Sequence, residues 1–402
     1  MRRLLVFTSA IVFFDVAFYA AIAPLLPDYV HEFGLSHAEA GVLAAAYAAG
    51  TLAASLPAGF VAGRVGPRRT VIAGLLLLGG SSVVFGFAES VVLLDCARFA
   101  QGISGALIWS GALTWLISTA APERRGAVIG TALGTAVAGA LVGPIFGAVA
   151  AEVGTEATFG AVFALTVVLA VIAAQLPDVE APEQQTLSEV FDAMLSRPIV
   201  TATLFVAIPS LMFGAVEVLV PLRIDELGGG HAAIAGGFIA AAALEAGLAP
   251  LVGRYSDRTG RRVPFVVGIG VCACSMLAIA GAGALVPILG ALILGSLGAG
   301  ICFTPALTTL SETAESSRLH QGFAAGLSNM AWAAGQMFGA VAGGAAASAA
   351  GYEAPSVAIA VLLVITAAYA YRVLPPPLAR PPGGALSTDD VLPAEEVRPA
   401  EG

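Results

Sequence analysis

The chain has 402 residues, of which 58% are hydrophobic and only 11% are charged. A soluble domain carries about 25% charged residues, so this composition excludes an ordinary soluble protein and indicates one embedded in lipid. The net charge is −9, and all 18 basic residues are arginine. These arginines do not form extended basic patches with interleaved aromatic residues, so we expect no nucleic-acid partner.

The apolar segments are long enough to cross a membrane repeatedly. A bilayer core about 30 Å thick requires about 20 apolar residues per helix. The apolar run after Arg3 is too long for a signal peptide, whose hydrophobic region has about 7–15 residues, and it contains Asp15. We interpret it as a retained first span of a multi-pass protein of the cytoplasmic (inner) membrane. The twelve predicted spans are 4–27, 40–63, 70–88, 91–119, 126–150, 157–176, 198–222, 233–254, 263–283, 285–310, 321–349 and 355–373.

The arginines test this helix count. Basic residues concentrate in the cytoplasmic loops of membrane proteins. With both termini in the cytoplasm, sixteen of the 18 arginines lie on the inner side. Only Arg223 falls in an outer loop, and Arg98 falls within a span. A wrong helix count would have scattered the arginines over both faces.

The two halves of the chain repeat one loop motif. The loop after the second span contains Gly59, Arg64, Gly66, Arg68 and Arg69. The loop after the eighth span contains Gly253, Asp257, Arg258, Gly260, Arg261 and Arg262, and it aligns with the first at a separation of 194 residues. Two repeats of six helices are an architecture of secondary transporters. Gly59 would let the second span approach a neighbour closely.

This repeat predicts an all-α membrane protein of twelve transmembrane helices in two pseudo-symmetric six-helix bundles. We expect the bundles to comprise residues 1–176 and 198–373. Residues 177–197 read as a cytoplasmic linker, whose second half has apolar residues at helical spacing and is expected to lie on the membrane surface. The segment 374–402 is rich in Pro, Gly and acidic residues, and we expect a disordered tail.

The loop after the eighth span resembles the hallmark motif of the major facilitator superfamily: glycine, three residues, aspartate, arginine, then glycine and two basic residues. The first copy departs from this pattern, because Gly63 occupies the position of the aspartate. In the family, this aspartate helps to latch the outward-open state. The resemblance therefore leaves open whether the first half of this chain has such a latch.

The fifth span is similar to the glycine–proline motif typical of antiporters of this family. Its Gly139 and Gly143 form a pair that permits close helix contact, Pro144 allows a bend, and Gly147 follows. The first span, with Asp15 and two later prolines, resembles the twelve-span drug:proton antiporters, which include the vesicular amine transporters. The resemblance covers about residues 5–373 and implies the major facilitator fold and multidrug efflux coupled to protons.

Three of the carboxylates within predicted spans are candidate functional groups, because a charge there is costly unless it is solvated, paired or protonated. Asp15 lies near the middle of the first span, and Tyr19 is one turn further on the same face. We expect Asp15 to bind a cationic substrate or a proton, with a structural hydrogen bond as the alternative. Glu217 and Glu245 are candidate proton carriers, since carboxyl groups in apolar surroundings take up protons more readily. Their alternative role is cavity lining or helix pairing.

Other polar and aromatic residues in the spans are candidates for substrate or proton binding. Arg98 and Gln101 resemble the basic motif that the family associates with proton coupling, and a local pair between Arg98 and Asp95 is the alternative. Trp109 offers a stacking or cation–π surface, unless it serves only for packing.

The eleventh span presents Asn329, Trp332 and Gln336 on one helix face. The vesicular amine transporters carry an aspartate near the position of Asn329, and an acidic residue like Glu217. An amide can bind a substrate but cannot carry a proton, so the resemblance does not extend to the same proton relay.

These features predict a secondary active transporter that exports a small lipophilic or cationic compound in exchange for protons, by alternating access. A symporter that imports a sugar, amino acid or organic anion is the alternative, and a membrane receptor or enzyme is a more distant one. No nucleophile–base set, metal-ligand spacing or nucleotide-binding loop is evident in the sequence. We therefore expect no cofactor, with the proton gradient as driving force. The expected partners are a small-molecule substrate, protons and the lipid bilayer, and we expect a monomer.

Overall fold

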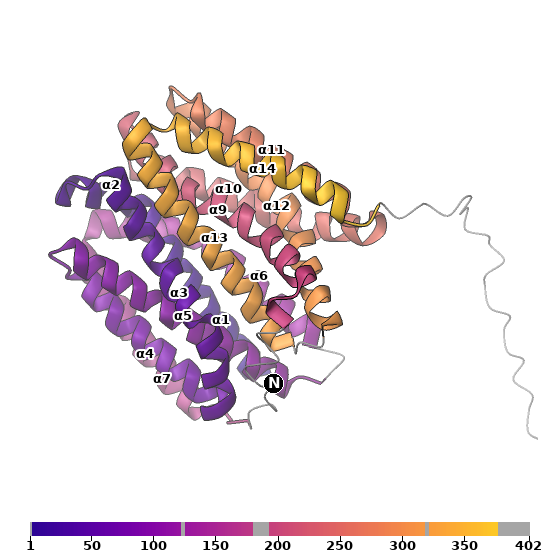
Figure 1. Ribbon diagram of the computed structural model, residues 1–402. Helices are drawn as coiled ribbons and strands as arrows, with labels where there is room; N and C mark the ends of the chain where they lie inside the picture. The colour runs from indigo at the N-terminus through magenta and orange to yellow at the C-terminus, as the bar shows by residue number, and fades with distance from the viewer. Residues whose placement is uncertain (1, 122–124, 180–192, 318–320, 377–402) are drawn as a thin grey trace, which may run out of the picture.

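The computed structural model describes residues 2–121, 125–179, 193–317 and 321–376, and all regular elements within these ranges are α-helices (Figure 1). The helices are α1 (Arg2–Ala20), α2 (Ile22–Phe33), α3 (His37–Val65), α4 (Pro67–Gly86), α5 (Val91–Thr119), α6 (Arg125–Val153), α7 (Thr155–Gln175), α9 (Arg197–Glu226), α10 (His231–Thr259), α11 (Arg262–Ala280), α12 (Leu285–Ser316), α13 (Gln321–Ala350) and α14 (Glu353–Val373).

Each predicted span corresponds to one helix, or to the pair α1 and α2, which only Ala21 separates. Eleven segments of the described chain are long and apolar enough to cross a membrane, and one of them is the combined α1–α2 segment. Helix α13 has 30 residues but is not among them. Polar residues such as Ser328, Asn329 and Gln336 lower its hydropathy. The predicted fold class, a twelve-helix membrane protein, is confirmed.

The repeated loops have the same backbone conformation. Gly66 joins α3 to α4 with φ 91°, and Gly260 joins α10 to α11 with φ 87°. Side chains other than glycine rarely adopt this conformation. The internal repeat that is visible in the sequence is therefore also present in the geometry of the two loops.

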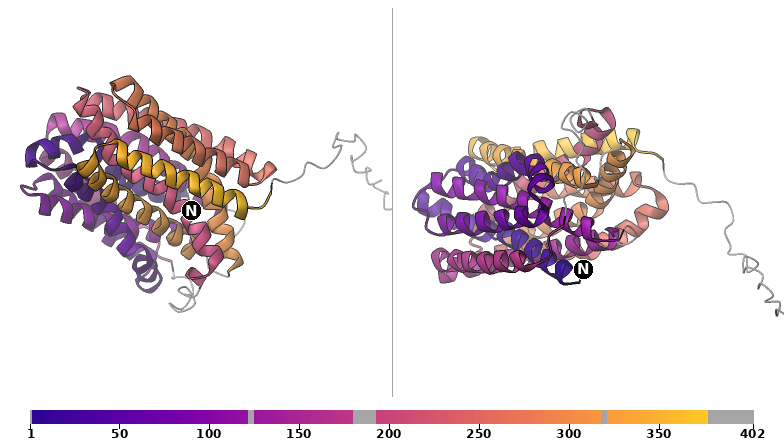
Figure 2. Two further views of the ribbon diagram at one scale, coloured as in Figure 1. Left: turned by 45° about the horizontal axis from the view of Figure 1, so that its top comes forward. Right: turned by 90° about the horizontal axis from the view of Figure 1, so that it is seen from below.

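The helices form two bundles, each with its own apolar core. One core draws on α1–α7 together with Val218 and Leu222 of α9 and Ala340 of α13, and the other draws on α9–α14. Figure 1 and both views of Figure 2 show the indigo and purple helices on one side and the orange and yellow helices on the other. The predicted amphipathic segment within 180–192 and the tail from 377 onward lie outside the described residues.

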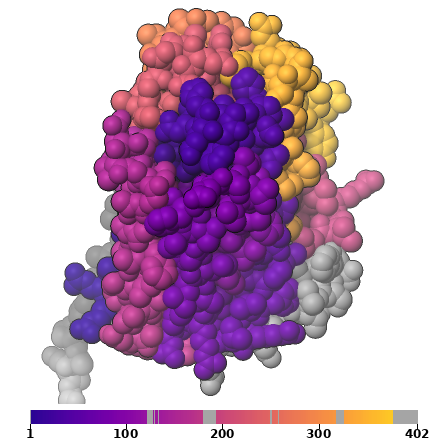
Figure 3. Space-filling model, turned by 90° about the vertical axis from the view of Figure 1, so that its left-hand side faces the viewer, coloured from indigo at the N-terminus to yellow at the C-terminus, as the bar shows by residue number. Residues whose placement is uncertain are grey.

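The bundles meet along two helix pairs, α3 with α13 and α6 with α10. In the first pair small residues allow close approach, since a Cβ added to Gly41 would lie 2.5 Å from the carbonyl oxygen of Ala340. Figure 3 shows indigo residues of the first bundle directly beside orange and yellow residues of the second bundle at one end of the molecule.

Polar contacts join the bundles at the end of the molecule away from the arginine-rich loops. His31 lies 3.3 Å from Asp225, and His231 lies 2.8 Å from Asp28. A third pair joins α3 to α9, where His37 lies 3.5 Å from Glu226. We call this end of the molecule the histidine-rich end.

At the end that holds the arginine-rich loops, two described ion pairs each lie within one bundle. Arg68 pairs with Asp178 at 2.9 Å, and Arg261 pairs with Glu312. From the positive-inside rule, we expect the histidine-rich end to face the outer side of the membrane.

Candidate functional site

A cluster of polar and aromatic side chains lies where α1, α3 and α5 face α9 and α13. Asp15 is only 1% exposed. Its Oδ2 accepts a hydrogen bond from Nε1 of Trp109 at 3.1 Å and one from the hydroxyl of Tyr47 at 3.4 Å. Its Oδ1 is buried without a hydrogen-bond partner. Because a carboxylate has about four acceptor sites, Asp15 keeps capacity for a proton or a cationic ligand.

Tyr19 connects the two bundles at this cluster. Its hydroxyl donates to Oε2 of Glu217 at 2.9 Å and accepts a hydrogen bond from Nε2 of Gln336 at 2.6 Å. The Tyr19 ring lies 4.8 Å from the ring of Tyr47 and 5.4 Å from that of Trp332, measured between centroids. One side chain of α1 therefore contacts the surroundings of Asp15 on one side and two helices of the second bundle on the other.

Arg98 is the buried cation of the cluster, with 2% exposure. It donates to Oε1 of Gln101 at 3.1 Å and to the backbone carbonyl of Tyr19 at 3.4 Å. Its guanidinium lies 5.1 Å from the ring centroid of Tyr47. Gln101 in turn donates to Ser82 at 3.4 Å.

The alternative pairing of Arg98 with Asp95 is absent from the described contacts. Oδ1 of Asp95 has no hydrogen-bond partner. The charges that act on Arg98 include Glu217, which belongs to the second bundle. Since no described ion pair neutralises Arg98 directly, its charge is available to the acidic residues around it.

Two sequence candidates have no described contact with this cluster. Glu245 packs against α12, where a Cβ added to Gly300 would lie 3.3 Å from Cα of Glu245. Neither Glu245 nor Asn329 forms a hydrogen bond or ion pair with another described residue. The structure thus brings eight of the ten candidates together: Asp15, Tyr19, Arg98, Gln101, Trp109, Glu217, Trp332 and Gln336.

Sequence analysis missed Tyr47, which contributes its hydroxyl to Asp15 and its ring to Arg98. A signal was present, since Tyr47 is the one aromatic residue in the alanine-rich run 40–54. Tyrosine combines an apolar ring with a hydroxyl that needs a partner when it is buried. A lone tyrosine in such a run is therefore a candidate for a polar cluster.

The glycines of the fifth span pack α6 onto α1, the helix that carries Asp15. A Cβ added to Gly139, Gly143 or Gly147 would overlap backbone oxygens of α1 or of the residue that follows it. These are the carbonyl oxygens of Phe13, Ala17 and Ala21. The earlier glycines of the same span, Gly130 and Gly134, have no atom within 4 Å of an added Cβ.

The second bundle has a matching glycine series that sequence analysis missed. Gly335, Gly339 and Gly343 of α13 follow the first series by 196 residues and pack onto α9. The α9 residues that they contact are Ala207, Leu211 and Ala215, which follow the α1 residues by 194 residues. An alignment of the fifth span with the eleventh would have revealed the series.

In each of the two repeated loops, an arginine donates a hydrogen bond to a backbone carbonyl of another helix in the same bundle. Arg68 donates to the carbonyl of Leu176 at 3.1 Å at the end of α7. Arg262, the equivalent residue, donates to the carbonyl of Tyr371 in α14, and its guanidinium lies 3.8 Å from the Tyr371 ring centroid. The other loop arginines, Arg64, Arg69 and Arg258, are exposed.

Three expectations about these loops have different outcomes. An added Cβ at Gly59 would meet no atom within 4 Å, so the close helix approach expected there is absent. A Cβ added to Gly253 would meet only the side chain of Thr304, at 3.8 Å. The side chain of Asp257 lies outside the described residues.

Comparison with known proteins agrees with this architecture. The model of the Major Facilitator Superfamily matches residues 6–319. The MFS-type transporter ppzB of Metarhizium rileyi is 34% identical over 124 residues, which are 30% of this chain and 26% of that protein. An uncharacterized MFS-type transporter of Burkholderia pseudomallei is 36% identical over 114 residues, which are 26% of this chain and 28% of that protein. These alignments span about a quarter of the length of each relative.

The fold is also similar to that of a solved structure. A bacterial homologue of the human lysosomal transporter Spinster, in an inward-facing and unoccupied conformation, superposes with a TM-score of 0.72 at 15% identity. The match covers 92% of this chain and 96% of the other. With the family match over most of the sequence, the chain belongs to the major facilitator superfamily of membrane transporters.

Proposed function

We propose that this transporter exports a small lipophilic or cationic compound in exchange for protons. The observation that carries the proposal is the double contact of Tyr19, which links the surroundings of Asp15 in one bundle to Glu217 in the other. Buried ionisable groups in membrane spans mark substrate and ion pathways. Here two of them lie at the junction of the bundles that alternating access must separate.

Asp15 is the proposed binding group for a cation or a proton. Its free Oδ1 can accept one ligand, and two donors already fix the position of its other oxygen. A proton and a substrate cation neutralise the same charge. They therefore compete for Asp15, and this competition couples their movements without covalent chemistry.

Glu217 is the proposed switch between the bundles. As a carboxylate it accepts the hydroxyl proton of Tyr19 and attracts Arg98 across the junction. Protonation removes the negative charge and weakens both interactions, since hydrogen bonds to charged groups are about twice as strong as neutral ones. The junction is then easier to open.

The aromatic residues define the class of substrate that we propose. Trp109, Trp332 and Tyr47 surround the acidic groups with ring surfaces. Such rings bind organic cations through cation–π interactions and lipophilic groups through apolar contact. A lipophilic cation matches both properties.

We also propose that the structure represents an inward-facing form in the cytoplasmic membrane. Its described cross-bundle ion pairs lie at the end that the arginine distribution assigns to the outside. The solved structure with a similar fold is described as inward-facing.

Inverted membrane vesicles test the direction of transport. Respiration acidifies their interior, which a pH-sensitive dye records. An exporter that exchanges protons releases them when ethidium or tetraphenylphosphonium is added outside, so the dye signal recovers. Co-transport of proton and substrate in the same direction would instead establish the symporter.

The same assay tests the site. Asp15→Asn keeps the size of the side chain but removes its charge, and we expect it to abolish substrate-dependent proton release. Glu353→Gln, which neutralises an exposed carboxylate at the start of α14, serves as the matched control and should exchange normally. Undiminished exchange by Asp15→Asn would refute the proposed role of this residue.

A further inference from the structure

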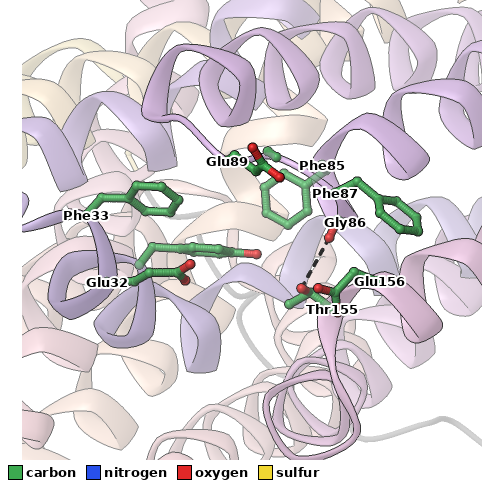
Figure 4. A pocket seen from close by; sticks show the side chains of 10 residues that line it. Glu32, Phe33, Phe85, Gly86, Phe87, Glu89, Thr155 and Glu156 are labelled. Atoms are coloured by element: carbon green, nitrogen blue, oxygen red, sulfur yellow. Dashed lines mark hydrogen bonds between the residues drawn. The ribbon is translucent and has the colours of Figure 1, made fainter.

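A cavity of about 260 Å³ lies at the histidine-rich end of the first bundle, away from the cluster around Asp15. It lies between the end of α2, the connection of α4 to α5, and the start of α7. Figure 4 shows Glu32 and Phe33 on one side of it, with Phe85 and Glu89 on another and Glu156 opposite Glu32. The lining thus combines aromatic rings with three carboxylates.

The carboxylates of Glu32, Glu89 and Glu156 are exposed at this cavity, and none forms a hydrogen bond or ion pair with another described residue. The described part of the chain holds no group of three acidic, histidine or cysteine residues close enough to share a metal ion. The three negative charges are therefore spread around the cavity, which suits a cation larger than a single metal ion.

Tyr29 provides an independent observation. It is only 5% exposed, it lines the cavity, and its hydroxyl has no hydrogen-bond partner. Leaving a buried hydroxyl unpaired costs about 1–3 kcal/mol. An occupant of the cavity that accepts or donates a hydrogen bond would remove this cost.

The rings of the cavity are arranged as a partial cage. The Tyr29 ring is stacked with Phe33, with centroids 6.3 Å apart, and meets Phe85 edge-on at 5.5 Å. Phe87 adds a fourth ring and is 60% exposed. Aromatic faces beside carboxylates are the surroundings that favour alkylammonium groups, through cation–π attraction and direct charge complementarity.

We propose that this cavity is a second binding site, specific for organic ammonium groups. Two sources can supply that group: a soluble ammonium compound, or the headgroup of an aminophospholipid at the membrane surface. The site is separate from the Asp15 cluster and does not depend on the direction or coupling of transport. It binds ammonium compounds at the end of the molecule opposite the arginine-rich loops.

Calorimetry on the purified full chain tests the site with choline as the probe. The neutral analogue 3,3-dimethylbutan-1-ol has the same shape without the charge, and we expect it not to bind. The cavity variant Glu89→Gln/Glu156→Gln should weaken choline binding by about tenfold, because it removes two charges next to the cation. Tyr29→Phe should weaken it by a smaller factor.

Two control variants make the test specific. Glu152→Gln/Glu353→Gln removes the same number of exposed carboxylates outside the cavity, at helix ends of the same side, and should bind choline normally. Loss of binding in Asp15→Asn would place choline in the central cluster and overturn the proposal. Thermal unfolding of each variant verifies that it is folded.

Lipid nanodiscs distinguish the two sources of the ammonium group. If a headgroup occupies the site, replacing phosphatidylglycerol by phosphatidylethanolamine should lower the apparent affinity for choline, and this effect should be absent in the cavity variant. If the site serves soluble compounds, the lipid change should leave the affinity unchanged. Equal binding by the cavity variant and its control, or binding of the neutral analogue as tight as that of choline, would overturn the proposal.

Discussion

The hydroxyl of Tyr19 has two partners, Glu217 and Gln336, and both belong to the opposite bundle. A hydroxyl has only one proton to donate. Because Gln336 donates to the oxygen of Tyr19, that proton is directed to Glu217. The orientation of the amide of Gln336 therefore determines which residue accepts the hydrogen bond from the hydroxyl of Tyr19. Oε1 of Gln336 is buried without a partner, which is consistent with an amide held by this single contact.

Tyr19→Phe should impair exchange without unfolding the protein. The phenylalanine ring keeps the contacts with Tyr47 and Trp332 but loses both hydrogen bonds. A hydrogen bond to a charged group contributes about 1.5–3 kcal/mol, so we expect the exchange rate in inverted vesicles to fall by about tenfold or more. Tyr369→Phe, which removes a hydroxyl that contacts Thr201 within the second bundle, is the control. Equal exchange rates in Tyr19→Phe and Tyr369→Phe would mean that Tyr19 contributes only through packing.

The members of the cluster were predictable from the sequence, but their pairing was not. Asp15, Glu217 and Gln336 are conspicuous because a polar side chain is costly in an apolar span. Tyr19 and Gln336, however, are 317 positions apart in the chain. Their contact depends on how the two bundles dock. Glu245 shows the limit of prediction from the sequence. It is also an acidic residue in an apolar span, but it lies against α12.

At the scale of helices, two glycine series serve the same purpose in the two bundles. They pack α6 onto α1 and α13 onto α9, the helices that carry Asp15 and Glu217. Glycine spacing alone did not identify these helix pairs, because Gly130 and Gly134 have the same four-residue spacing but open space beside them. The spans were predictable from the sequence, since the bilayer sets their length. The helix that packs against each span was not predictable, since it depends on which face of the helix is buried.

Leucine substitutions should separate glycines that pack from glycines that do not. Gly143→Leu and Gly339→Leu place a side chain against the backbone of α1 and α9, and overpacking of this kind costs about 1–3 kcal/mol or more. We expect a clear fall in the thermal unfolding temperature of both variants. Gly134→Leu, at a glycine of the same span with open space beside it, should unfold near the temperature of the unmodified protein. Similar losses at Gly134 and Gly143 would contradict the packing role.

At the scale of the whole molecule, the described polar contacts between the bundles are concentrated at two levels. One is the central cluster, and the other is the end where three histidines pair with carboxylates. Tyr352 joins this end by donating to Glu226 at 2.7 Å. Burial raises the pKa of the Tyr352 hydroxyl above its ordinary value, so this group stays protonated and does not change its charge with pH.

Acidification of the histidine-rich side should favour closure of that end. The imidazolium form of each histidine attracts its facing carboxylate, and the neutral form lacks this attraction. The charged groups that face the histidines include Asp28, Glu152, Arg223, Asp225 and Glu226, of which only Arg223 is positive. Exposed pairs contribute about 0.3–1 kcal/mol each. Three of them should change the ratio of closed to open molecules by roughly tenfold.

Distances between spin labels measure this equilibrium. Labels at Val92→Cys and Val286→Cys, two exposed positions at this end of different bundles, should show a smaller closed population at pH 8 than at pH 5.5. The background variant needs serine at the native cysteines, because Cys96 and Cys274 are exposed. His31→Gln/His37→Gln/His231→Gln should remove most of the pH dependence. His320→Gln, which changes the remaining histidine in a predicted cytoplasmic loop, should preserve it. A closed population that does not change with pH would mean that apolar packing of α3 against α13, rather than charge, holds this end together.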